Sequence, residues 1–84
     1  MTKLPHVDID ATGLLCPQPL LRLKMAMQEI AAGESLCIAV TDEHAELDFQ
    51  VWCERFGHHL TGPIEQSDRQ LFVVTKGGSE SLES

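Results

Sequence analysis

Polar and apolar residues alternate near the start of the chain and then change to a helical spacing. In the stretch PHVDID, residues 5–10, two apolar side chains alternate with polar ones, which is the period-two pattern of a half-buried strand. After a turn through Gly13, apolar residues recur at helical spacing from residue 17 to about residue 32, and Gly33 follows as a C-terminal stop. The apolar stripe of this predicted helix consists of Leu20, Leu23, Met27, Ile30 and Ala31.

A second strand and helix follow with the same change of period. Residues 35–41, SLCIAVT, are mostly apolar and include β-branched side chains, which favours a central strand. Residues 43–56 return to helical spacing, with Thr41 or Asp42 available as an N-terminal cap and Gly57 available to end the helix. The apolar face of this second predicted helix carries Ala45, Phe49, Trp52, Cys53 and Phe56.

Two further strands complete the predicted fold. The segments HLTGPIEQ, residues 59–66, and QLFVVTK, residues 70–76, are predicted strands joined by a turn near Ser67 and Asp68. The element order is therefore β-α-β-α-β-β, and each helix has a single apolar stripe to bury. This pattern predicts an α/β (α+β) two-layer sandwich, in which both helices cover one face of a four-stranded mixed sheet.

Length and charge limit the possible functions. The chain has 84 residues, enough for one small domain over residues 1–76, and residues 77–84 form a small, polar and acidic segment expected to be a mobile tail. We expect a soluble, cytoplasmic protein, because the sequence has neither a membrane-length apolar run nor a signal-peptide pattern. Thirteen acidic against six basic residues give a net charge of −7, which argues against direct nucleic-acid binding and suits a partner with a basic patch.

One cysteine stands at the start of the first predicted helix. The sequence Cys16-Pro17-Gln18-Pro19 suits a helix that has Cys16 as its N-cap, because proline is tolerated in a first turn whose N–H groups lack intrahelical acceptors. In that position the amide of Gln18 stays free and the helix dipole favours a thiolate, so we predict a lowered pKa for the Cys16 thiol. The alternative is that Cys16 is a small buried residue before a proline-started helix.

The other candidate groups favour a structural interpretation. Cys37 lies in an apolar strand and Cys53 on the core face of the second helix, so we expect both to be inert. The chain has no CxxC pair for dithiol chemistry, and the spacing of its three cysteines does not match a zinc ribbon. His58 and His59 follow a helix end, where imidazoles interact well with the dipole. We therefore predict no metal site.

The motifs of this sequence resemble those of the TusA (SirA-like) family of sulfur carriers along nearly the whole chain. The segments that carry the resemblance are DATGLLCPQPLLRLKMAM, GESLCIAVTDEHAELDFQVWCERFGHHL and LFVVTKGG. Where family members often have Asp-Pro after the second strand, this chain has Asp42-Glu43, which affects the choice of partner. The matching positions are Gly13, Leu14, Cys16, Pro17, Pro19, Lys24, Asp42, Asp48, Trp52, Cys53, Gly57 and His58.

The resemblance implies a sulfurtransferase in which Cys16 carries persulfide sulfur between proteins. A thiolate at Cys16 would take sulfur from a donor such as a cysteine desulfurase and pass it to a downstream acceptor protein, with no metal or bound cofactor. Family members serve tRNA thiolation, sulfur oxidation or cofactor sulfuration. The alternative is a non-catalytic regulatory or redox-sensing module.

Two groups of residues around Cys16 are predicted to assist this chemistry. The first supports the thiol, and the second, at the outward side of the predicted helix start, is a candidate surface for docking a partner. The supporting residues are Gly13, Pro17, Gln18, Pro19 and Leu20, and the docking residues are Leu21, Arg22, Lys24 and Met25.

Overall fold

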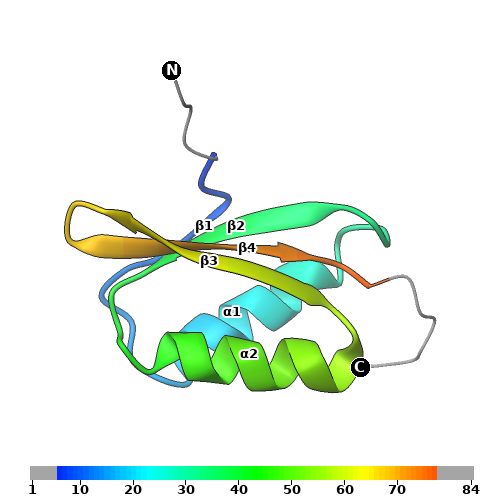
Figure 1. The fold of residues 1–84 in the computed structure, drawn as a ribbon, viewed down its shortest axis with the longest axis horizontal. Coiled ribbons are helices and arrows are strands. Elements are labelled where there is room, and N and C mark those ends of the chain that lie inside the picture. Colours follow the sequence, from blue (N-terminus) through cyan, green and yellow to red (C-terminus); the bar gives the residue numbers. More distant parts are fainter. Residues whose placement is uncertain (1–5, 78–84) are drawn as a thin grey trace.

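Two helices cover one face of a four-stranded sheet in the computed structural model, which describes residues 6–77 (Figure 1). This arrangement confirms the predicted α+β two-layer fold. In chain order the elements are β1 (Ile9–Ala11), α1 (Gln18–Met27), β2 (Ser35–Val40), α2 (Ala45–Phe56), β3 (His59–Gln66) and β4 (Arg69–Thr75). No helix in the described part of the chain is long and apolar enough to cross a membrane.

The sheet has the strand order β1-β2-β4-β3, with one parallel and two antiparallel pairings. β1 runs parallel to β2, so α1 is the crossover that connects them. Since the carboxyl ends of neighbouring parallel strands meet at one edge of a sheet, the β1–α1 loop and the β2–α2 loop lie next to each other. This edge carries Cys16.

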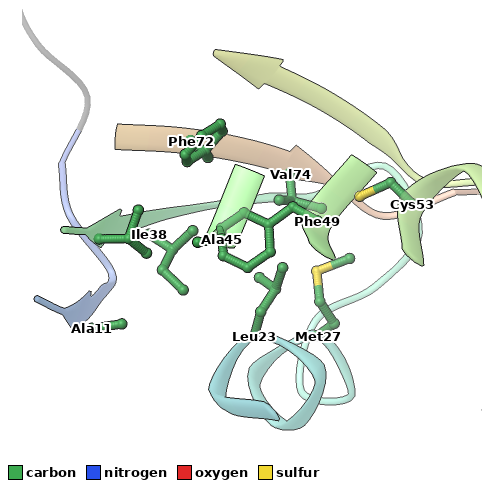
Figure 2. Packing of buried hydrophobic residues seen from close by; sticks show 10 residues of the cluster. Ala11, Leu23, Met27, Ile38, Ala45, Phe49, Cys53, Phe72 and Val74 are labelled. Carbon is green, nitrogen blue, oxygen red and sulfur yellow. The ribbon is translucent and has the colours of Figure 1, made fainter. Parts of the chain in front are cut away.

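The core lies between the helices and the sheet. On β2, Ile38 and Val40 belong to the core on the helix side, whereas Cys37 and Ala39 face a smaller apolar cluster on the opposite side. Figure 2 shows the larger core, where Leu23 and Met27 rise from α1 toward Phe49 of α2. The rings of Phe49 and Phe72 meet edge to face with their centroids 5.3 Å apart. This packing fixes α2 against the sheet.

Helix α1 ends at Met27, five residues before its predicted end. The reason lies at the other end of the chain, where Lys76 follows β4. Its Nζ donates hydrogen bonds to the carbonyl oxygens of Met27 at 3.0 Å and Ile30 at 2.8 Å. A cation at a helix C-terminus satisfies orphan carbonyls and complements the dipole. Ile30 still packs against the core although it lies beyond the helix.

Smaller differences from the predicted elements have local causes. β1 begins at Ile9 instead of residue 5, because only from that residue does the chain pair with β2 as a ladder. Helix α2 begins at Ala45, and Phe56 at its last turn is 36% exposed instead of belonging to the core. Gly57 ends α2 with a φ of 79°, as predicted. Most of the expected acidic tail lies outside the described residues.

Candidate functional site

The loop that carries Cys16 is held by side chains from the neighbouring β2–α2 loop. The amide of Gly13 donates to Oγ1 of Thr41 at 2.8 Å, and the amide of Cys16 donates to Oδ2 of Asp42 at 2.6 Å. Gly13 has a φ of 82°, a conformation that glycine adopts without strain. The two loops therefore hold each other in place, and the thiol itself remains exposed.

Cys16 is not the N-cap of α1, contrary to the prediction. Pro17 occupies that position, Gln18 is the first helical residue, and the Cys16–Pro17 peptide bond is cis. The amide of Gln18 is not free either, because it donates to the carbonyl oxygen of Leu15 at 2.8 Å. Pro19 is buried. The thiol thus lies one residue before the N-cap of α1.

The thiol of Cys16 contacts a carboxylate from the other helix. Its Sγ donates a hydrogen bond to Oδ2 of Asp48, in the first turn of α2, at 2.8 Å. This bond to Asp48, followed by desolvation and by the negative charges of Asp48 and Asp42, raises the pKa of the Cys16 thiol. The predicted lowering of this pKa is therefore wrong. The carboxylates stabilise the protonated sulfur, and they outweigh the dipole of a helix that the thiol does not cap.

Asp42 organises the turn into α2. Its side chain is 8% exposed and accepts hydrogen bonds from the amides of His44 and Cys16. These two bonds, from His44 first and Cys16 second, lower the pKa of the Asp42 carboxyl group. Asp42 therefore stays ionised and continues to hold the backbone of Cys16.

A groove between the two helices opens beside Asp48. It has a volume of about 490 Å³ and combines apolar side chains with charged ones. Leu20 and Lys24 of α1 line one side, so the predicted supporting residue Leu20 and the predicted docking residue Lys24 both face this groove. The α2 side is lined by Leu47, Asp48, Val51, Trp52, Arg55 and Phe56.

The other predicted docking residues lie together on a different part of α1. Leu21, Arg22 and Met25 line a shallow hollow with Gln18 near the helix start. Leu21 is 50% and Met25 67% exposed, as the helical spacing predicts. The structure thus divides the predicted docking set into three residues on the outer face and Lys24 in the groove.

The two remaining cysteines are buried, as predicted. Cys37 and Cys53 are each 3% exposed. Burial raises the pKa of the Cys37 thiol and raises that of Cys53 to about 11. No group of three or more His, Cys, Asp or Glu side chains in residues 6–77 could hold a metal ion.

Asp42 and Asp48 match the family motif, but the sequence patterns did not place them next to the thiol. Both contacts are tertiary, since Asp42 and Asp48 lie 26 and 32 residues after Cys16. A signal was nevertheless present, because parallel pairing of the first two strands brings the loops that follow them to one edge. An acidic residue in the second loop was therefore a candidate neighbour of the thiol.

Comparison with known proteins identifies the family of the chain. The model of the family described as sulfurtransferase TusA matches residues 7–76. The chain belongs to the TusA sulfurtransferase family. It is 38% identical over 77 residues to the sulfur carrier protein TusA of Pseudomonas entomophila, with 90% of this chain and 96% of that protein covered.

Two further proteins are similar to this chain, one a longer relative and one a solved structure. The chain is 34% identical over 78 residues to YrkF of Bacillus subtilis, and it spans 93% of its own length but only 42% of YrkF. The crystal structure of a SirA-like protein from Desulfitobacterium hafniense superposes with a TM-score of 0.73 at 26% identity. That superposition covers 82% of this chain and 95% of the other. The fold is therefore that of the SirA-like protein.

Proposed function

We propose that this protein is a persulfide carrier that accepts sulfur on Cys16 and passes it to a second protein. The observation that carries the proposal is the exposed thiol held at the meeting of two loops, in a chain of the TusA family whose two other cysteines are buried. Cys16 can reach the reactive cysteine of another protein without any opening of the fold. Cys37 and Cys53 cannot.

The proposed donor is a cysteine desulfurase or another protein that bears a cysteine persulfide. Sγ of Cys16 attacks the terminal sulfur of the donor persulfide, the donor S–S bond breaks, and the donor cysteine leaves as a thiolate. An acceptor thiolate then attacks the terminal sulfur on Cys16, and Cys16 leaves in turn. Neither step changes the number of S–S bonds, so the carrier needs no oxidant, metal or bound cofactor.

Sulfur loading tests the assignment directly. The protein is incubated with a cysteine desulfurase and cysteine, and its intact mass is measured before and after reduction. We expect a reducible gain of sulfur that is lost in Cys16→Ala and retained in Cys53→Ala, the matched control at a buried thiol. Cys16→Ser is also expected to fold without accepting sulfur, because a hydroxyl can donate to Asp48 but is too weakly acidic to exchange. Sulfur gain by Cys16→Ala would refute the proposal.

The alternative is a redox-sensing module without sulfur transfer. A sensor thiol must react with dissolved oxidants in the resting protein, and the reactive species is the thiolate. The raised pKa of Cys16 keeps the resting thiol protonated, which opposes this function. A carrier instead reacts with a persulfide, whose sulfur is brought to the thiol by the donor. Oxidation of Cys16 by dilute peroxide without any sulfur loading would favour the sensor.

We further propose that partners dock on the outer face of α1. Leu21 and Met25 expose apolar surface on the helix that follows Cys16. Arg22 lies beside them, and Lys24 borders the surface on the groove side. Leu21→Glu combined with Met25→Glu is expected to slow sulfur delivery from the desulfurase while leaving Cys16 alkylation unchanged.

A control variant separates docking from a general effect of charge. Gln28→Glu combined with Ala31→Glu adds the same two negative charges at exposed positions just beyond the far end of α1. We expect this variant to receive sulfur at the wild-type rate. Equal rates for both double variants would place docking elsewhere.

A further inference from the structure

The hydrogen bond between Cys16 and Asp48 joins the reacting sulfur to a well-fixed carboxylate. Asp48 precedes Phe49, which is fully buried and anchors α2 to the core. The packing of the helix therefore fixes the backbone of Asp48, and the hydrogen bond from Cys16 orients its carboxylate. Its Oδ2 accepts a hydrogen bond from the Cys16 thiol, with Sγ and Oδ2 2.8 Å apart. Among the described residues Asp48 forms no salt bridge, and its Oδ2 accepts the hydrogen bond from the sulfur of Cys16.

We propose that Asp48 is a catalytic residue of sulfur acceptance, whose carboxylate takes the Cys16 proton as Sγ attacks the donor persulfide. This inference rests on the proposed function and adds a named proton acceptor to it. Asp48 touches the reacting atom, and it is already on the hydrogen-bond line along which the proton must leave.

The step is balanced in atoms and electrons. The Cys16 S–H bond breaks and its proton moves to Oδ2 of Asp48, while the electron pair of Sγ forms a bond to the terminal sulfur of the donor. The donor S–S bond breaks, and its electron pair leaves with the donor cysteine as a thiolate. The protonated Asp48 then returns its proton to that thiolate or to water. The products are the Cys16 persulfide and the donor thiol, with no net oxidation.

The resting site explains why a proton acceptor is needed at this moment. The thiol faces Asp48 from α2 and the loop residue Asp42, which pairs with His44. Lys24 of α1 lines the same groove as Asp48 without forming a described ion pair with it. The negative surroundings keep the sulfur protonated until it attacks. As the new S–S bond forms, the S–H group becomes a much stronger acid, and a carboxylate in contact with it can then accept the proton.

Two assays on Asp48→Asn separate this role from a structural one. The amide keeps the size of the side chain but removes the charge and the basic oxygen. We expect the rate of sulfur acceptance from glutathione persulfide to fall about 100-fold, the low end of what a general base contributes. We expect iodoacetamide alkylation of Cys16 to move to lower pH, because the thiol no longer faces that negative charge.

The opposite movement of the two assays is the signature of the proposed role, since a distorted site would slow both. Glu54→Gln is the matched control, because it removes one charge from an exposed position of the same helix and should change neither assay. Asp48→Glu, which keeps a carboxylate, is expected to accept sulfur faster than Asp48→Asn.

The outcomes distinguish failure of this inference from failure of the proposed function. If the wild-type protein gains sulfur and Asp48→Asn gains it at the same rate, the role of Asp48 is refuted and the carrier function stands. If the wild-type protein gains no sulfur from either the small persulfide or a desulfurase, the carrier function is refuted and the role of Asp48 with it.

Discussion

In the folded protein, Cys16 is expected to react with iodoacetamide at least ~100 times faster than Cys37 or Cys53. The perturbation is alkylation of the native protein under excess reagent, and the physical basis is access. Cys37 lies on β2, which is paired on both sides, and Cys53 lies in the core layer of α2. A reagent reaches either thiol only when these elements open.

The magnitude follows from the size of the domain. At 84 residues, the free energy of unfolding is expected to be about 4–13 kcal/mol, so the open form is populated to ~10⁻³ or less. The pKa of about 11 for the Cys53 thiol adds a second factor in the closed state, because roughly one molecule in a thousand carries the thiolate at pH 8. Cys16 is exposed, so its reaction does not require the fold to open. Its raised pKa should still make it react more slowly than free cysteine at the same pH.

Peptide mapping after timed alkylation measures the three rates separately. The control is the protein in concentrated guanidinium, where all three thiols should react at similar rates. Native labelling of Cys37 or Cys53 within tenfold of the Cys16 rate would refute the reasoning, because it would mean that the core opens far more often than this packing allows. Cys16 reacting faster than free cysteine would refute the account of its carboxylate neighbours.

Three further predictions concern stability. Leu23→Ala is expected to lower the free energy of unfolding by about 2–5 kcal/mol in urea titrations, whereas Leu21→Ala on the exposed side of the same helix should change it by less than ~0.5 kcal/mol. Because the pKa of Asp42 is lowered in the folded protein, its ionised carboxylate contributes stability above about pH 4, and this contribution is lost as the pH falls. Asp42→Asn should therefore flatten the acid side of a plot of unfolding free energy against pH. A Cβ at Gly62 would lie 2.8 Å from a carbonyl oxygen of β4, so Gly62→Ala should lower the melting temperature more than Gly33→Ala, where no atom lies within 4 Å.

The sequence was sufficient for the fold because each element has its own periodicity. The change from period two to helical spacing located both helices, and one apolar stripe on each placed them on the same face of the sheet. The end of α1 was misplaced because Lys76, nearly fifty residues away, supplies the groups that satisfy its last carbonyl oxygens. Local sequence carries no sign of such a contact.

The surroundings of Cys16 could be predicted only in part, because some of its neighbours are distant in the sequence. The exposed thiol and the supporting turn followed from local features, namely Gly13 and the two prolines around Gln18. The direction of the Cys16 pKa shift could not be predicted from local features, which include only the helix dipole. Asp48 and Asp42 raise this pKa, and parallel pairing of β1 with β2 brings them next to the thiol. Electrostatic properties of a surface thiol depend on whichever charges folding brings within a few ångströms.

Because Asp48 is shared between the inter-helix groove and the Cys16 thiol, the groove and the thiol are thermodynamically linked. A cationic group that enters the groove and pairs with Asp48 withdraws the hydrogen-bond acceptor from the sulfur and offsets its negative field. Such a ligand must bind more tightly to the thiolate form than to the thiol form, and by reciprocity it must release protons as it binds. Its affinity should therefore rise with pH across the titration of Cys16, even if it never touches the sulfur.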